Sequence, residues 1–246
     1  MNLATQSVFI TGGTRGIGFE LAKAFTARGS KVAICGRSAD HVSDAKSQLP
    51  DVMASQCDLS DIDALPGFVN RLRLSFGAPT ILVNNAGIQF NQSWLESSSA
   101  ERLAQLKLEV CVNLTSTLAL TALLLDDLVR GGAAVVNVSS LLALKPKRSA
   151  PVYCATKAAI RSFSKALRYQ LEPYPNVRVV EVVPPLVDTG MTEGRGTGKI
   201  SAAQAASEIV RGLEHDLTEI YVGKAKILRL LDRLVPSITA RLLRDG

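Results

Sequence analysis

Histidine and paired cysteine are the reactive groups that this 246-residue sequence has least of. It contains two histidines, His41 and His215, which argues against a catalytic triad built on histidine and against a histidine-rich metal centre. Any proton transfer must therefore use other side chains. The cysteines have neither metal-site nor redox-motif spacing, so we expect no metal and four buried free thiols, at Cys35, Cys57, Cys111 and Cys154.

A long uninterrupted apolar run is also missing. The longest, around residues 118–125, is too short to cross a bilayer, and residues 1–6 are polar where a signal peptide would be apolar. Hydrophobic residues make up 47% of the chain and charged residues 20%, the balance of an ordinary globular protein. The length fits one large domain, and we expect a cytoplasmic location.

Positive charge is concentrated at the C-terminal end. The formal net charge is +6, and residues 224–246 hold six basic and two acidic residues, so this tail carries +4 of it. The remainder is close to neutral, which argues against a nucleic-acid binder. The tail has an apolar stripe before Pro236, which predicts an amphipathic helix. It can pack on another subunit of a homodimer or homotetramer, cover a substrate pocket, or contact a membrane; the first two are favoured.

Short apolar runs alternate with longer helical patterns along the rest of the chain. This alternation predicts an α/β fold: a doubly wound, Rossmann-type parallel sheet of about seven strands in the order 3-2-1-4-5-6-7, within one domain over residues 1–223. Residues 184–200 contain two prolines and four glycines and form either a substrate lid or a plain surface loop. The expected strands are residues 7–11, 31–35, 52–57, 81–84, 134–139, 178–183 and 219–222, and the expected helices are 16–27, 39–49, 62–76, 100–129 and 152–171.

A glycine-rich turn follows the first expected strand and opens the first helix. Its glycines, Gly12, Gly16 and Gly18, allow a tight turn close to a pyrophosphate, and the helix N-terminus offers free N–H groups. The second strand is followed by Arg37 where an NAD-binding protein usually has an acid, and Arg15 lies in the turn itself. A carboxylate there would repel a 2′-phosphate, whereas a guanidinium can bind one through two N–H groups, so NADP(H) is favoured over NAD(H). The alternative is that both arginines are solvated surface charges.

Tyr153 and Lys157 are four residues apart, on one face of an expected helix. A tyrosine with its ordinary pKa near 10 is a poor base at neutral pH. A neighbouring ammonium favours the phenolate, which lets the hydroxyl exchange a proton with a substrate oxygen. The pair alone is a weak signal, because such pairs occur on many helices.

The motifs taken together resemble the single-domain short-chain dehydrogenase/reductase family over nearly the whole chain. They occur in the family's order: the glycine turn, the segment 84–87 (Asn-Asn-Ala-Gly), Asn113, the pair Ser139-Ser140, and Tyr153 with Lys157. The short stretches 87–89 and 221–226 are similar to a bacterial branch, the DltE-like oxidoreductases.

The resemblance implies a role for each catalytic residue. Tyr153 would be the general acid/base, and Lys157 would lower its pKa and bind the nicotinamide ribose. Ser140 would hydrogen-bond the substrate carbonyl, with Ser139 the less favoured choice. Asn113 would distort its long helix and hold a water that leads to Lys157.

The cofactor contacts follow in the same way. Asp58 is either an adenine contact or a helix cap before Ser60, and Pro184-Pro185 replaces the family's Pro-Gly, which stiffens the loop entry. The implied contacts are Gly12, Thr14, Arg15, Gly16, Ile17, Gly18, Arg37, Ser38, Asp58, Leu59, Asn85, Ala86, Gly87, Tyr153, Lys157, Pro184, Val187 and Thr189.

The expected function is NADP(H)-dependent hydride transfer on a small-molecule carbonyl or secondary alcohol. Reduction of a 3-oxoacyl group on a carrier, and a catalytically silent cofactor-binding regulator, are the alternatives. The loop 141–148 should border the substrate mouth with an apolar wall, and Gln89, Phe90 and Met191 should lie nearby. Its cations, Lys145, Lys147 and Arg148, form either a solvated rim, which is favoured, or an attraction for acidic substrates.

Overall fold

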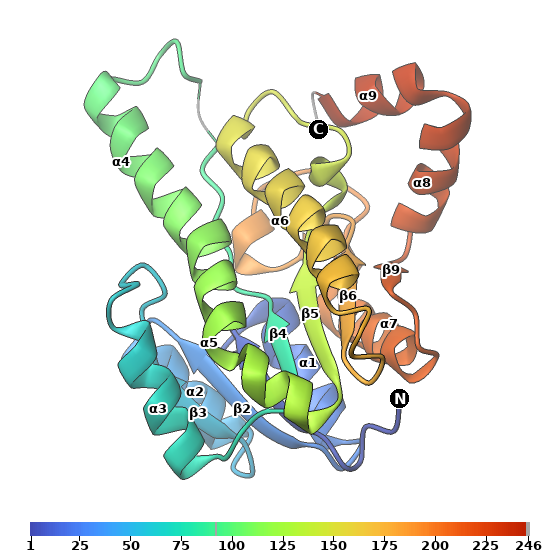
Figure 1. Cartoon of the computed structure of the whole chain (residues 1–246). Coiled ribbons are helices and arrows are strands. Elements are labelled where there is room, and N and C mark those ends of the chain that lie inside the picture. The colour runs from blue at the N-terminus through green and yellow to red at the C-terminus, as the bar shows by residue number, and fades with distance from the viewer. Residues whose placement is uncertain (92, 245–246) are drawn as a thin grey trace.

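One parallel sheet organises the chain, for which the computed structural model describes residues 1–91 and 93–244. Its seven strands lie in the order β3-β2-β1-β4-β5-β6-β9 (Figure 1). This is the predicted topology, with β9 as the seventh strand of the sheet, so the predicted fold is confirmed. The strands are β1 (Ser7–Thr11), β2 (Lys31–Gly36), β3 (Met53–Gln56), β4 (Ile81–Asn84), β5 (Ala134–Val138), β6 (Arg178–Val183) and β9 (Glu219–Tyr221).

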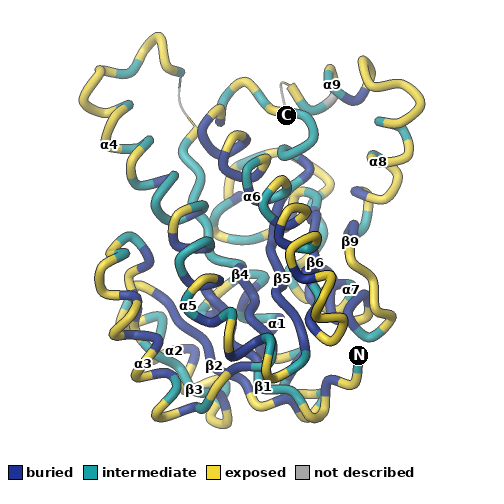
Figure 2. The backbone as a smooth tube through the Cα atoms, in the orientation of Figure 1, coloured by how far each residue is buried: buried dark blue, intermediate teal, exposed yellow. Residues whose placement is uncertain are grey.

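Helices cover both faces of this sheet, which is why the central strands are mostly apolar. Strands β4 and β5 are buried at every position. One face carries α1 (Gly16–Thr26), α2 (Ala39–Gln48) and α7 (Ala202–Glu214), and the other carries α3 (Leu65–Ser75), α5 (Ser116–Gly131) and α6 (Pro151–Gln170). The burial map shows dark strands inside paler helices (Figure 2).

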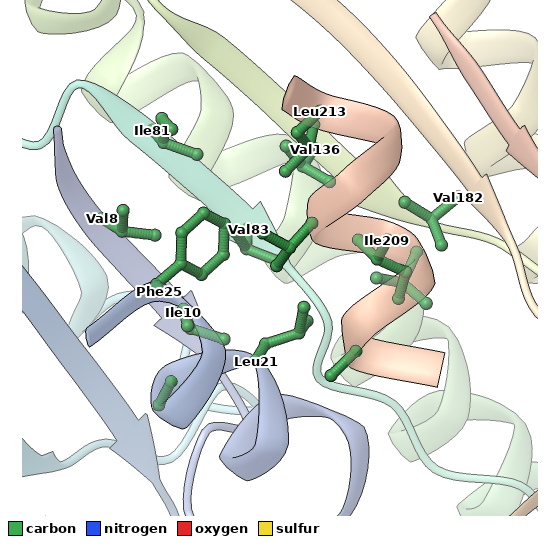
Figure 3. Close-up of a cluster of buried hydrophobic side chains, with 14 of the residues drawn as sticks. Val8, Ile10, Leu21, Phe25, Ile81, Val83, Val136, Val182, Ile209 and Leu213 are labelled. Carbon is green, nitrogen blue, oxygen red and sulfur yellow. The ribbon is translucent and has the colours of Figure 1, made fainter. Parts of the chain in front are cut away.

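The core on the first face brings together distant parts of the chain (Figure 3). Leu21 and Phe25 of α1 and Ile209 and Leu213 of α7 pack on valines and isoleucines of the central strands. Helix α7 was not among the predicted elements. Its buried stripe includes Ala205 and Ala206, and small alanines give a weak periodic signal in a sequence.

Residues 184–200 are more regular than the sequence suggested. Strand β7 (Val187–Asp188) pairs in parallel with β8 (Ile200–Ser201), and a short 3-10 turn, η3 (Gly190–Thr192), lies between them. The hydroxyl of Thr192 donates to the carbonyl of Val187 at 2.6 Å, which holds the turn against β7. The segment therefore starts directly after β6 and ends in a second, two-stranded sheet formed by β7 and β8.

The tail forms two helices, α8 (Ala225–Leu234) and α9 (Pro236–Arg244), separated at the predicted proline. Residues 245–246 of the expected tail lie outside the described residues. Leu228 and Leu243 pack with Leu141, at the start of the loop 141–148, and the carboxylate of Asp232 pairs with Lys145 at 3.2 Å. The tail thus braces the loop that the sequence placed at the substrate mouth.

A continuous helical run extends from α4 (Ser99–Val110) through a π-helical turn, η1 (Cys111–Thr115), into α5. By length and composition alone, this 33-residue run could cross a membrane, which the shorter apolar stretch 118–125 could not. Leu120, Leu124 and Leu128 are buried against the sheet, so the apolar character of α5 is explained by the core.

Truncating a core side chain tests this packing. Leu21→Ala should lower the free energy of unfolding by about 2 to 5 kcal/mol, because Leu21 is fully buried between α1 and the sheet. Leu230→Ala, at a position 59% exposed on α8, should change it by less than about 0.5 kcal/mol. Denaturant titration of both variants measures the difference, and equal losses would contradict this description of the core.

Candidate active site

A cavity of about 520 Å³ lies at the carboxyl ends of the strands. Its wall is formed by residues that directly follow β1, β2, β4, β5 and β6, together with residues of α6 and of the segment 184–195. Ligands of doubly wound sheets bind at this edge, where strand order reverses between β1 and β4. The fold therefore brings the separate sequence motifs to one place.

The glycine turn forms one wall of the cavity. Gly12 and Gly16 have φ values of 63° and 58°, a conformation that L side chains rarely adopt. A Cβ on Gly18 would lie 2.3 Å from the carbonyl oxygen of Gly12, so only glycine lets α1 start this close to the turn. Asn85 braces the turn, because its Nδ2 donates to the carbonyls of Thr11 and Gly12 at 3.0 and 3.2 Å.

Two predicted phosphate ligands, Arg15 and Arg37, line the same end of the cavity. Arg15 precedes α1, and Arg37 directly follows β2. Asp58 also lines it, and hydrogen bonds from the backbone and hydroxyl of Ser60 lower the pKa of its carboxyl. Helix α3 begins only at Leu65, so Asp58 closes a turn rather than capping that helix.

A pair of thiols at this end was not predicted as part of the site. Cys35 is the residue before the last of β2, and Cys57 directly follows the neighbouring β3. Both cysteines line the cavity. Their mutual hydrogen bond raises the pKa of Cys35 well above its usual value and lowers that of Cys57. All four cysteines are free; Cys111 is partly buried and the other three are buried.

Tyr153 lies at the other end of the cavity, 9% exposed, near the start of α6. Burial raises the pKa of its hydroxyl to about 12, and a hydrogen bond with the side chain of Ser140 acts in the opposite direction. The neighbouring Ser139 is committed elsewhere, since its hydroxyl donates to the buried carboxylate of Glu181 at 2.7 Å. The geometry therefore distinguishes the two serines and pairs Ser140 with the tyrosine.

Lys157 is buried one helical turn along α6. Its Nζ donates to the carbonyl of Val138 at 2.8 Å and lies 5.6 Å from the centre of the Tyr153 ring. Burial lowers the pKa of this ammonium to about 8. The spacing of Tyr153 and Lys157 suggested a lowered pKa for the tyrosine. In the polypeptide alone, burial instead raises that pKa.

Asn113 occupies the middle of the π-helical turn, the local distortion that the resemblance implied. Its Oδ1 accepts from the backbone N–H of Ile88 at 2.8 Å, and its Nδ2 donates to the carbonyl of Ile88 at 2.9 Å. A Cβ on Gly87 would lie 3.3 Å from that Oδ1 and 3.5 Å from the Nζ of Lys157. Gly87, Asn113 and Lys157 therefore meet at the cavity wall, which Gly87 and Lys157 line.

Most of the predicted site residues reach the cavity surface. Gly18 and Asn113 do not line it but contact residues that do. Ser140 is half-buried and joins the site through its hydrogen bond with Tyr153, whereas the less favoured Ser139 lines the cavity itself. Gln89 and Met191, proposed near the substrate, also line it. The predicted residues that line the cavity are Gly12, Thr14, Arg15, Gly16, Ile17, Arg37, Ser38, Asp58, Leu59, Asn85, Ala86, Gly87, Tyr153, Lys157, Pro184, Val187 and Thr189.

A buried acid close to the catalytic end was missed by the sequence analysis. Glu109 is 2% exposed, one helical turn before Asn113, and accepts a hydrogen bond from the backbone N–H of Phe90 at 3.3 Å. Burial raises the pKa of its carboxyl to about 7. Its negative charge contributes to the raised pKa of Tyr153. A glutamate in an expected helix gives no sequence signal of such burial.

Comparison with known proteins agrees with this geometry. A family model described as short chain dehydrogenase matches residues 6–199. The chain belongs to the short-chain dehydrogenase/reductase family. It is therefore an oxidoreductase of that family, and the predicted family is confirmed.

Three individual proteins are similar to this chain over most of its length. The oxidoreductase DltE of Bacillus subtilis (strain 168) is 37% identical over 236 residues, which cover 93% of this chain and 92% of that protein, in agreement with the DltE-like motifs. A 3-oxoacyl-[acyl-carrier-protein] reductase, FabG, of Chlamydia muridarum is 32% identical over 78% of each chain. A short-chain dehydrogenase from Burkholderia cenocepacia J2315, solved in complex with NADP, is 28% identical with a TM-score of 0.86 over 99% of both chains.

The buried Glu109 of this short-chain dehydrogenase/reductase makes its stability depend on pH. The folded-state pKa of about 7 exceeds the ordinary value of 4.5, so the folded state binds the proton more tightly and stability is lost as pH rises between these values. Glu109→Gln should therefore raise the free energy of unfolding at pH 8 by about 1 to 3 kcal/mol and leave it nearly unchanged at pH 4.5.

Chemical denaturation across this pH range measures the difference. Glu96→Gln, the same substitution at an exposed position, should show no comparable pH-dependent gain. A gain for Glu109→Gln that stayed constant from pH 4.5 to 8 would show that the carboxyl is not desolvated.

Proposed function

We propose that this enzyme transfers a hydride between NADP(H) and a carbonyl or secondary alcohol carbon, with Tyr153 as general acid/base. One observation carries the proposal. Tyr153, Ser140 and Lys157 meet at one end of a cavity whose other end has the glycine turn, Arg15 and Arg37. A dinucleotide bound along this cavity would place its reactive ring beside a proton donor.

The residues at the turn fit a phosphorylated dinucleotide. Gly12 and Gly16 keep the turn free of side chains, because both have a positive φ and a Cβ on Gly12 would lie 2.9 Å from the Cα of Ala86. The N-terminus of α1 directly follows this turn. Arg15 and Arg37 supply cations, and no carboxylate directly follows β2. The relative from Burkholderia cenocepacia, solved with NADP, supports the same cofactor here.

The protein's own groups hold and move the proton. The bound nicotinamide supplies or accepts the hydride. With a pKa near 12, the Tyr153 hydroxyl is protonated at neutral pH and can donate to the carbonyl oxygen as the carbon is reduced. Ser140 hydrogen-bonds and orients that oxygen, and the Lys157 ammonium binds the ribose and favours the phenolate when the reaction runs toward oxidation.

A second candidate substrate is a 3-oxoacyl group on a carrier, which the FabG relative of Chlamydia muridarum favours. The convergence of Asn113, Ser140, Tyr153 and Lys157 disfavours a catalytically silent regulator. We further propose a cytoplasmic homodimer or homotetramer acting on small molecules. Exposed apolar side chains on α4 and α6, such as Leu103 and Tyr169, support assembly through these helices.

Tyr153→Phe tests the acid/base assignment. The change removes the hydroxyl and keeps the ring, so kcat for carbonyl reduction should fall by roughly 10²- to 10⁴-fold while the Kd for NADPH changes little. Turnover of a panel of carbonyl compounds and a 3-oxoacyl thioester is followed by NADPH absorbance, and binding by NADPH fluorescence. Tyr174→Phe, at an exposed tyrosine in the loop after α6, is the control. Normal reduction by Tyr153→Phe would remove the tyrosine from its role.

Arg37→Asp tests the choice of cofactor. Replacing a cation with an anion beside the 2′-phosphate should weaken NADPH by roughly 10- to 100-fold and NADH by much less. Binding titrations with both cofactors measure the ratio. Arg211→Asp, exposed on α7, makes the same charge change away from the cavity and should leave the ratio as it is. Equal losses for NADPH and NADH would refute the phosphate role of Arg37.

A further inference from the structure

A half-buried cation on the substrate side of the cavity has no role in the scheme above. Arg195 lies between η3 and β8 and lines the cavity. Its Nη2 makes a long hydrogen bond of 3.5 Å to the carbonyl of Gln89, which follows β4 across the cavity. Its Nη1 is buried and has no hydrogen-bond partner. A buried guanidinium N–H without an acceptor destabilises the protein. A ligand that supplies an acceptor would remove this penalty, and its binding would be strengthened accordingly.

Arg195 lies near the catalytic tyrosine, and not near the residues expected to bind the phosphates of the cofactor. Its positive charge contributes to lowering the pKa of Tyr153, against the larger effect of burial, so the guanidinium lies within electrostatic range of the catalytic hydroxyl. Arg15 and Arg37 line the opposite end, beside the glycine turn. Met191, on the same segment as Arg195, and Gln89 complete the wall around it.

The charges around Arg195 are unbalanced. Within residues 1–91 and 93–244, no ion pair to an Asp or Glu involves Arg195. The buried acid of this region, Glu109, bonds to Phe90 instead. The guanidinium of Arg195 therefore faces the cavity without a carboxylate from the described part of the chain, and a bound anion would balance its charge.

We propose that Arg195 binds the carboxylate of the substrate, and that the enzyme acts on short oxo acids and the corresponding hydroxy acids. The inference rests on the proposed function and adds the class of substrate to it. A guanidinium presents parallel N–H groups that match the two oxygens of a carboxylate, and the unpaired Nη1 and the weakly bonded Nη2 are two such donors.

The chemistry needs two points of attachment. The carboxylate stays unchanged at Arg195 while the carbonyl oxygen lies at Ser140 and Tyr153. In reduction, the carbonyl carbon gains the hydride and its oxygen gains the proton of Tyr153, which gives a hydroxy acid. Holding both ends of a short substrate limits its orientation, which favours one approach of the carbonyl to the hydride donor.

The test compares an acid with its neutral ester. The wild-type enzyme is assayed with NADPH on 2-, 3- and 4-oxo carboxylates of about four to six carbons and on their methyl esters. The wild type should prefer at least one acid over its ester, and the ratio of the two kcat/KM values should fall by roughly 10- to 100-fold in Arg195→Gln. Arg195→Lys should retain part of the ratio, and Arg211→Gln, which removes the same charge on α7, should retain all of it.

A binding measurement separates this inference from the proposed function. Butanoate, which cannot be reduced, is titrated into the NADPH complex, and its Kd should rise by at least about 10-fold in Arg195→Gln. An equal loss for acid and ester, or weaker NADPH binding by this variant, would overturn the inference. If the oxo acids were not turned over while other carbonyl compounds were reduced, the inference would be overturned and the proposed function would stand. If no carbonyl compound were turned over, the proposed function would fail, and the butanoate titration would still decide whether Arg195 holds a carboxylate.

Discussion

The site depends on a buried ammonium and the carbonyl that receives it. Lys157 is 4% exposed, and the hydrogen bond from its Nζ to Val138 joins the middle of α6 to the end of β5. Removing an ammonium from water is costly, which is why its pKa is lowered to about 8. Gly87 lies close to the Nζ of Lys157 and to Asn113 of the π-helical turn, because a Cβ at this position would lie 3.5 Å from the former and 3.3 Å from the latter's Oδ1. The position of Tyr153 on the same helix follows from this arrangement.

The two ends of the cavity differ in their charged groups. The end beside the glycine turn carries Arg15 and Arg37, while the catalytic end combines Lys157 and Arg195 with the buried Glu109. Burial pushes the pKa values of Tyr153 and Glu109 upward and that of Lys157 downward. All three shifts favour the neutral form of each group, so the catalytic end is arranged for proton exchange more than for permanent charge.

The sequence predicted the features that depend on local pattern. The seven strands, the glycine turn and the spacing of Tyr153 and Lys157 are all readable along the chain. Properties that arise from packing were not predictable in this way. Helix α7 was missed because its buried stripe is partly alanine, and the raised pKa of Tyr153 comes from burial by distant segments. Arg195 gave no signal either, because its partner Gln89 is 106 residues away in the chain.

The π-helical turn also controls how α4 is oriented. An α-helix turns about 100° per residue, and the extra residue of a π-turn therefore offsets the faces of α4 and α5 by about that angle. This is why α5 presents its leucines to the sheet while α4, on the left of Figure 1, extends away from it with only Glu109 buried. Deleting one residue between Cys111 and Thr115 would convert the π-turn to a regular α-helical turn and rotate α4 about its own axis relative to α5. The π-turn that contains Asn113 thus also determines which side of α4 any neighbouring molecule would meet.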